Sequence, residues 1–161
     1  MYYGKIDKVD IANGSGVRVS LFVSGCDLRC KGCFNPETWN FKYGRKFTND
    51  TVIEILKAMA PDYITGLTVL GGEPLHEKNY AEVSLLCHLV KKYYPDKTIW
   101  IYTGKSFEDV RHLRILKNVD VLVDGSFIEE EKDITLKFRG SRNQRIIDVQ
   151  ESFRVGTLKL L

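Results

Sequence analysis

The stretch Val17-Arg18-Val19-Ser20-Leu21-Phe22-Val23-Ser24-Gly25-Cys26 decides the fold, because it predicts a strand that ends directly before a cluster of cysteines. Residues 17–23 are almost all β-branched or apolar, which is typical of a strand buried on both faces, as in a parallel sheet. Ligand sites of α/β proteins lie where such strands end. The sequence therefore predicts an α/β fold with a functional loop that begins at Cys26.

That loop is Cys26-Asp27-Leu28-Arg29-Cys30-Lys31-Gly32-Cys33, and it holds three of the four cysteines of the chain. Four thiolates would saturate a [4Fe–4S] cluster, so the three at this C-x3-C-x2-C spacing would leave one iron without a protein ligand. An open metal position distinguishes a catalytic site from a structural one. A ligand set made of thiolates favours iron–sulfur clusters or zinc over hard cations. Three unrelated thiols are the alternative, and their clustering within eight residues argues against it.

Helical and strand patterns alternate along the rest of the chain. A helix is expected to start near Thr48, with Val52, Ile55, Leu56 and Met59 on one face, and a second helix to span about Glu77 to Tyr94. Further strands are expected at Leu67–Leu70, Thr98–Tyr102 and Val119–Val123. This alternation requires parallel strands with right-handed crossovers. The chain is too short for the roughly 250 residues of a closed barrel, so we expect an open partial (β/α) barrel.

The remaining segments give weaker patterns. Tyr2 to Ile11 predicts an extended edge segment that ends in a turn at residues 13–16. Ser106 with Asp109 resembles a helix capping box. Phe127 to Asp133 is acidic and predicts a helical turn, and Ile134–Phe138 and Arg145–Val149 predict short strands or edge segments.

The composition limits the classes of protein to which the chain can belong. The chain has 161 residues, 43% hydrophobic and 28% charged, which fits one globular domain over residues 1–161. A net charge of +3 is too small to imply nucleic-acid binding. No apolar run approaches the roughly 18–20 residues that span a bilayer, and the first residues lack the layout of a signal peptide. We therefore expect a cytoplasmic protein whose cysteines serve a metal.

Because parallel strands share one carboxyl edge, the loops after the strands should surround a single mouth. These loops are Cys26–Cys33, Gly71-Gly72-Glu73, Thr103-Gly104 and Asp124-Gly125. The glycine pair would let the backbone approach a ligand without a Cβ clash, and the Glu73 carboxylate could pair with an ammonium group. A plain turn is the alternative explanation of the two glycines.

The pattern Gly14-x-Gly16-x-Arg18-x3-Phe22-x2-Gly25-Cys26-x3-Cys30-x2-Cys33-x-Asn35 resembles that of the radical S-adenosylmethionine enzymes that activate glycyl-radical enzymes. The short length, Asn35-x2-Thr38-Trp39 and Arg139-Gly140-Ser141-x-Asn143-Gln144-Arg145 resemble in particular the activases of anaerobic (class III) ribonucleoside-triphosphate reductases. The resemblance covers the chain from about Gly14 to Val149.

The resemblance implies a mechanism. Cys26, Cys30 and Cys33 would hold three irons of a [4Fe–4S] cluster, and the amino and carboxylate groups of S-adenosylmethionine would chelate the fourth. An electron from the cluster would cleave the sulfonium C–S bond to give methionine and a 5′-deoxyadenosyl radical. That radical would take a hydrogen atom from a glycine of the reductase. The cofactors carry this chemistry, so no catalytic acid or base is expected beyond the cluster ligands.

The resemblance also assigns roles to individual residues. Gly71, Gly72 and Glu73 would bind the methionine amino group, and Gly32 and Phe34 flank Cys33 where an aromatic ring packs on adenine. Core packing is the alternative for Phe34. Thr103 and Asp124 would contact the ribose, the sulfonium region or the incoming glycine loop, although an aspartate at a strand end is more often a turn former.

Other residues have simpler interpretations. Cys87 lies on the apolar stripe of a helix and is interpreted as structural. His88 and His112 lack metal-ligand spacing, and His76 follows the Gly-Gly-Glu turn closely enough to contact a ligand; all three are interpreted as surface or packing residues. Lys137, Arg139, Arg142 and Arg145 would dock the reductase or an acidic electron donor, with a solvated edge as the alternative.

Two other functions compete with this one. A small radical S-adenosylmethionine enzyme with a small-molecule substrate, such as one of deazaguanine synthesis, would share the cysteine loop. A non-catalytic iron–sulfur or zinc module would need a fourth ligand near the first three, and the sequence has none at a usual spacing. For an activase, the electron donor is expected to be a flavodoxin or a ferredoxin. No nucleic-acid or membrane partner is expected.

Overall fold

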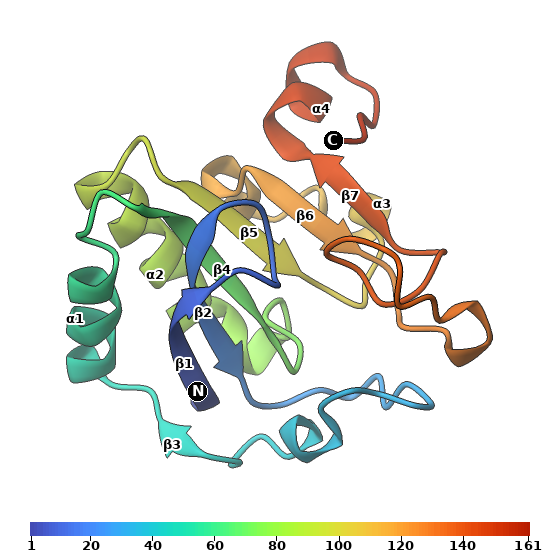
Figure 1. Ribbon diagram of the computed structural model, residues 1–161, viewed down its shortest axis with the longest axis horizontal. Helices are drawn as coiled ribbons and strands as arrows, with labels where there is room; N and C mark the ends of the chain where they lie inside the picture. Colours follow the sequence, from blue (N-terminus) through green and yellow to red (C-terminus); the bar gives the residue numbers. More distant parts are fainter.

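The computed structural model describes residues 1–161 and contains one open sheet of seven strands in the order β3-β1-β2-β4-β5-β6-β7 (Figure 1). The strands are β1 (Tyr2–Asp10), β2 (Val17–Val23), β3 (Arg45–Lys46), β4 (Ile64–Gly71), β5 (Thr98–Tyr102), β6 (Val121–Asp124) and β7 (Arg145–Asp148). Strands β2, β4, β5 and β6 run parallel, while β1, β3 and β7 pair antiparallel with their neighbours. The predicted α/β class and parallel centre are confirmed, and the antiparallel outer strands make the whole sheet mixed.

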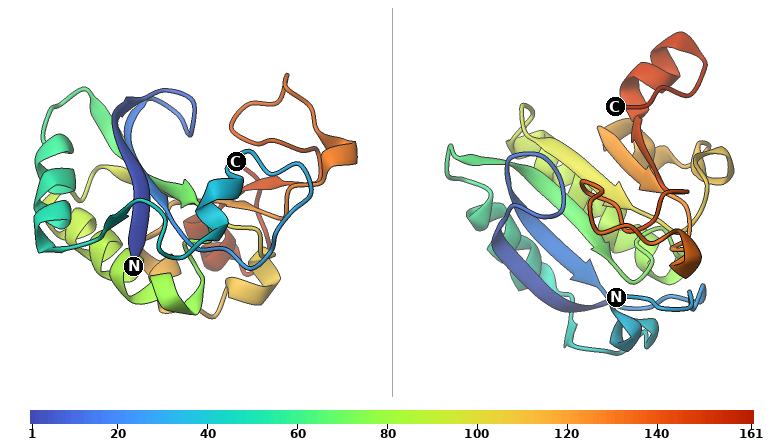
Figure 2. Two further views of the ribbon diagram at one scale, coloured as in Figure 1. Left: turned by 90° about the horizontal axis from the view of Figure 1, so that it is seen from below. Right: turned by 45° about the vertical axis from the view of Figure 1, so that its right-hand side comes forward.

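Helices cover one face of the sheet. They are α1 (Asn49–Ala58), α2 (Glu77–Tyr93), α3 (Phe107–Val110) and α4 (Val149–Val155), with 3-10 turns at η1 (Pro36–Trp39), η2 (Arg114–Asn118) and η3 (Glu129–Glu131). Both α1 and α2 lie on the same side in Figure 2. Cys87 lies on an apolar stripe of α2 as predicted, because Val83, Cys87 and Val90 are fully buried in a core cluster of 26 residues together with Ile99 and Ile101 of β5. Hydrophobic burial on this face supplies the main stabilisation of the fold.

The opposite face of the sheet is covered by loops and carries a buried arginine. Arg18 of β2 is fully buried, and it donates hydrogen bonds to the Thr68 hydroxyl at 2.7 Å and to the Leu67 and Thr98 carbonyls at 2.8 and 2.9 Å. Burial lowers its pKa to about 10. A Cβ on Gly14, whose φ is +127°, would lie 2.7 Å from the Arg18 Cδ atom. The Gly14-x-Gly16-x-Arg18 pattern therefore has a structural reason: it folds the β1–β2 loop over this arginine.

Two sequence predictions need correction. Ile134–Phe138 forms turns and bends instead of a strand, and Phe138 has a φ of +61°. Strand β7 ends at Asp148, and helix α4, which was not predicted, begins at Val149. The Asp148 side chain caps α4 by accepting a hydrogen bond from the Glu151 N–H at 3.0 Å, which stops the strand. The helical turn expected within Phe127–Asp133 is present as η3. None of the helices is both long and apolar enough to cross a membrane.

Candidate cofactor site at the ends of the parallel strands

A cavity of about 520 Å³ lies at the carboxyl ends of β2, β4 and β5. All four loops predicted to share one mouth contribute to it, and the lining residues of the first three include Cys26, Cys30, Cys33, Gly71, Gly72, Glu73, Thr103 and Gly104. The fourth predicted loop contributes Gly125, while Asp124 does not line the cavity. The β1–β2 loop and the segment after β6 complete the walls. One cavity thus brings the cysteine loop and the Gly-Gly-Glu turn together.

The backbone joins these two loops directly. The Gly72 N–H donates to the Val23 carbonyl at 2.7 Å, and the Glu73 N–H donates to the Gly25 carbonyl at 2.8 Å. A Cβ on Gly72 would come within 2.6 Å of the Gly25 oxygen, and one on Gly71, whose φ is +106°, within 2.7 Å of the Val23 oxygen. In this structure the glycine pair therefore allows the close approach of two chain segments, at a distance that real Cβ atoms do not tolerate.

The three thiols of the cysteine loop are partly exposed and all line the cavity. Burial raises the pKa of the Cys26 thiol, while the backbone N–H groups of Leu28 and Arg29 act in the opposite direction. The Asn35 N–H donates to the Cys33 sulfur at 3.4 Å. Hydrogen bonds to sulfur favour the thiolate, which is the form that binds metals. The side chains are not yet gathered into a group of three that could hold a metal ion.

Cys87 differs from these three. It is fully buried in the core beneath α2, and burial raises its pKa to about 12. Such a thiol behaves as a small apolar side chain. The structural interpretation of Cys87 is therefore confirmed.

Glu73 is a carboxylate that is only 2% exposed. Its Oε1 atom accepts hydrogen bonds from the Leu75 N–H at 3.0 Å and the Thr103 hydroxyl at 2.8 Å, and its Oε2 atom accepts one from the Gly104 N–H at 2.9 Å. Burial raises the pKa of the Glu73 carboxyl, and these hydrogen bonds partly offset the rise. A carboxylate accepts about four hydrogen bonds, so one position on Oε2 is left for another donor.

The structure gives His76 a role that the sequence did not indicate. Its Nδ1 atom accepts a hydrogen bond from the Lys78 N–H at 3.1 Å and caps α2, so its Nε2 atom carries the proton and donates to Asp27 at 2.9 Å. Asp27 lies between two cysteines of the loop. His76 therefore ties the cysteine loop to the start of α2, whereas His88 and His112 are exposed as predicted.

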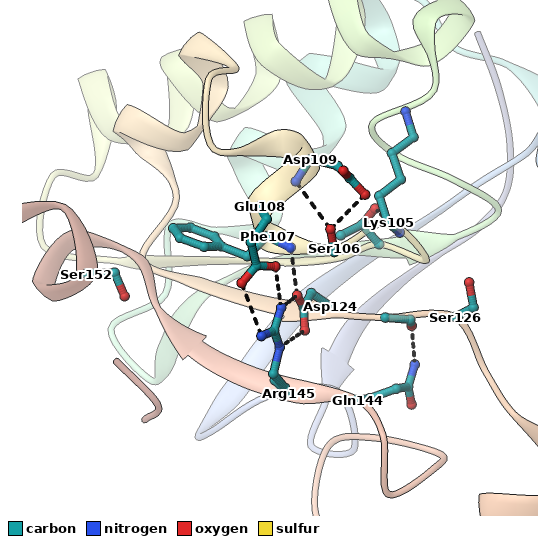
Figure 3. A network of polar contacts seen from close by, with 12 residues as sticks. Lys105, Ser106, Phe107, Glu108, Asp109, Asp124, Ser126, Gln144, Arg145 and Ser152 are labelled. Atoms are coloured by element: carbon teal, nitrogen blue, oxygen red, sulfur yellow. Dashed lines mark hydrogen bonds and ion pairs between the residues drawn. The ribbon is translucent and has the colours of Figure 1, made fainter. Parts of the chain in front are cut away.

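Asp124 is held in a polar network beside the cavity, shown in Figure 3. Its carboxylate accepts hydrogen bonds from Arg145 Nε at 3.0 Å and from the Phe107 N–H at 2.7 Å, and Arg145 also pairs with Glu108 at 2.8 Å. These two carboxylates raise the pKa of the Arg145 guanidinium. Asp124 and Arg145 thus join β6, β7 and α3, and both side chains are already engaged within the chain.

Gly32 and Phe34, the residues predicted to lie beside the adenine, are at the outer edge of the site. Phe34 lines the cavity, is 59% exposed, and packs against Phe127 with ring centroids 4.9 Å apart. Gly32 does not line the cavity, and a Cβ there would meet the Glu129 carboxylate at 2.9 Å. Lys31 pairs with the same carboxylate at 3.4 Å. The cysteine loop is therefore in contact with the segment that follows β6.

Residues 12–147, which include the sheet and the cysteine loop, match the family model described as "4Fe-4S single cluster domain", and this match identifies an iron–sulfur protein. Three relatives are each named anaerobic ribonucleoside-triphosphate reductase-activating protein. That of Enterobacteria phage T4 is 46% identical over 148 residues, covering 91% of this chain and 93% of its own. That of Vibrio cholerae is 40% identical over 150 residues (91% and 97%), and that of Escherichia coli K12 is 36% identical over 148 (89% and 96%). The chain belongs to this family of 4Fe-4S reductase-activating proteins.

Proposed function

We propose that the chain activates an anaerobic ribonucleoside-triphosphate reductase by reductive cleavage of S-adenosylmethionine at a [4Fe–4S] cluster. One electron cleaves the sulfonium C–S bond to give methionine and a 5′-deoxyadenosyl radical, and the radical removes a hydrogen atom from a reductase glycine to leave 5′-deoxyadenosine and a glycyl radical. The observation that carries the proposal is the single cavity shared by the three cysteines and the Gly-Gly-Glu turn. The names of the relatives support the choice of the reductase as partner.

Cys26, Cys30 and Cys33 would hold the cluster, which supplies the cleaving electron when it is bound. The donor set fits this group, because three partly exposed thiols line one cavity and backbone N–H groups point at two of the sulfurs. Metal binding is coupled to local folding, so we expect the loop to draw its three sulfurs together as the cluster binds. A flavodoxin or a ferredoxin would deliver the electron.

The Gly-Gly-Glu turn would receive the methionine end of S-adenosylmethionine. The remaining acceptor position on Glu73 Oε2 would suit one N–H of an ammonium group, and the Phe34 ring would pack on an adenine. Thr103 would act through Glu73, since its hydroxyl is already donated to that carboxylate. We place this site at the carboxyl edge of an open partial (β/α) barrel that forms a single domain.

The test is anaerobic reconstitution with iron and sulfide, followed by assays of 5′-deoxyadenosine and of the glycyl radical. Cys30→Ala should lose both cluster iron and cleavage, and Cys87→Ala, the matched control in the core, should keep its iron. Wild-type protein should form a glycyl radical, detected by electron paramagnetic resonance, when the cognate reductase is added. Cleavage without a partner radical would indicate a small-molecule substrate. A loaded cluster that cleaves nothing would indicate a metal-binding module without this activity.

A further inference from the structure

The segment Arg139–Arg145, called here the anchor segment, uses most of its polar groups inside the chain. Gln144 accepts hydrogen bonds from the Gly140 and Ser141 N–H groups at 2.8 and 3.1 Å, and it donates to the Gly125 carbonyl at 3.0 Å. Asn143 donates to the Ser126 carbonyl at 2.8 Å. These bonds fasten the anchor segment to the end of β6, as Figure 3 shows for Gln144.

The arginines predicted to dock a partner are mostly engaged in the same way. Arg139 donates to the Gln144 and Arg142 carbonyls at 2.5 and 3.3 Å, and Arg145 pairs with Asp124 and Glu108. Of the four basic residues predicted to dock a partner, Lys137 and Arg142 are exposed, and their side chains take part in none of the hydrogen bonds and ion pairs of the structure. The anchor segment is therefore organised to hold a shape, and two of its three arginines are engaged within the chain.

The anchor segment holds the turn Asp133–Phe138, called here the apolar turn, in its conformation. Asp133 fixes it, because its carboxylate accepts hydrogen bonds from the N–H and the hydroxyl of Thr135 at 2.9 and 2.6 Å. Ile134 at its tip is 89% exposed, more than any other large hydrophobic side chain in the protein. Ile134, Leu136 and Phe138 all line the cavity. Packing within the chain does not account for an isoleucine at this exposed tip.

The apolar turn is part of an apolar rim. Leu28 is 42% exposed and Phe34 is 59% exposed, and both line the same cavity as Ile134. The cysteine loop and the segment after β6 lie beside each other in the left view of Figure 2. Phe34 of the loop packs on Phe127 of that segment. Lys31 of the cysteine loop forms ion pairs with Glu129 and Glu130 of the facing segment. Apolar groups gathered at a cavity mouth mark an interaction site.

We propose that the apolar turn, with Leu28 and Phe34, is the surface on which the anaerobic reductase docks while its glycine-bearing loop enters the cavity, and that Ile134 is the anchor residue. This inference rests on the proposed function, in which the substrate atom is the Cα of a protein glycine. A protein partner has to cover the rim as its loop reaches the cavity, whereas a small substrate leaves Ile134 in water. The contact made by Ile134 is apolar, so its contribution to binding depends little on salt.

The test compares Ile134→Ser with Ile53→Ser, a control on α1 whose side chain is 48% exposed and does not line the cavity. Affinity for the purified cognate reductase is measured anaerobically in low and high salt. Loss of one buried isoleucine side chain should weaken binding about tenfold. The control should bind like wild type, and both variants should keep a wild-type midpoint of thermal unfolding.

Three results decide the proposal. Selective loss of affinity in Ile134→Ser at both salt concentrations supports it. Wild-type affinity in Ile134→Ser overturns it, and so does binding that fails in high salt and is weakened more by Arg142→Ala than by Ile134→Ser. Uncoupled cleavage of S-adenosylmethionine by the wild-type protein is measured in the same samples. If cleavage is absent but affinity is selectively lost in Ile134→Ser, the proposed chemistry is rejected and the docking surface is supported. The two failures are therefore distinguishable.

Discussion

Replacing Thr103 by valine tests the buried carboxylate at the centre of the site. Thr103 is 4% exposed, and its hydroxyl donates to Glu73 Oε1 at 2.8 Å while it accepts from the Lys105 N–H at 3.1 Å. Valine keeps the shape and removes both hydrogen bonds. A hydrogen bond to a charged group contributes about 1.5–3 kcal/mol, so we expect the free energy of unfolding of the cluster-free protein to fall by about 2–3 kcal/mol. For a chain of this size the midpoint of thermal unfolding should fall by about 4–10 °C.

The effect of Thr103→Val should also depend on pH. Burial raises the pKa of Glu73, so the native protein holds this proton more tightly than the unfolded chain does. The contribution of Glu73 to stability is therefore present below its ordinary pKa and is lost as the pH rises through the raised value. Loss of the hydroxyl donor raises that pKa further. The destabilisation by Thr103→Val should consequently be small in acid and should grow as the pH rises.

The matched control for this prediction is Thr135→Val. The Thr135 hydroxyl also donates to a carboxylate, that of Asp133 at 2.6 Å, but this pair is exposed to solvent. The control should therefore unfold like wild type in urea and on heating. Equal stability of the two variants at neutral pH would refute the reasoning. A loss of stability that does not change with pH would show that packing, and not the Glu73 charge, is responsible.

Three further predictions concern the supports of the site. Gly72→Ala should lose about 1–3 kcal/mol of unfolding free energy and reconstitute with less iron, because its Cβ meets the Gly25 backbone at 2.6 Å; normal iron content would contradict this. Asp124→Asn should lose about 2 kcal/mol, less than the roughly 3–5 kcal/mol of a fully buried pair because Arg145 is partly exposed, and should keep its iron; urea unfolding and iron analysis check both points. Gln144→Ala should make residues 133–138 more open to proteolysis and hydrogen exchange; unchanged protection there would show that the anchor segment holds without it.

Strong periodic patterns made much of the fold predictable. The bounds of β5 were predicted correctly, and α2 ends one residue earlier than expected, because each is a regular run with clear turn residues beside it. The meeting of the cysteine loop with Gly71-Gly72-Glu73 was also predictable, since the carboxyl ends of parallel strands share one edge. These predictions needed only local patterns and the geometry of a parallel sheet.

The features that sequence reasoning missed depend on distant partners. Ile134, Leu136 and Phe138 alternate with the period of a strand, yet no neighbouring strand is available to pair with them, and all three line the cavity instead. Asp124 forms an ion pair with Arg145, a residue 21 positions away in the sequence, and that pairing cannot be derived from local patterns. The start of α4 had a local signal, the capping pair Asp148 and Glu151, but the preceding apolar run favoured a strand.

A cysteine loop taken from this chain and grafted onto another scaffold would lose the hydrogen bonds that support it. Two backbone hydrogen bonds join Val23 and Gly25, just before the loop, to the turn after β4, and the Asp27–His76 contact joins the start of the loop to α2. These partners lie in a stretch of sequence separated from the loop by η1, β3 and α1. The smallest portable unit is therefore a pair of parallel strands with both of their loops, and a designer who wants this site must transplant the pair.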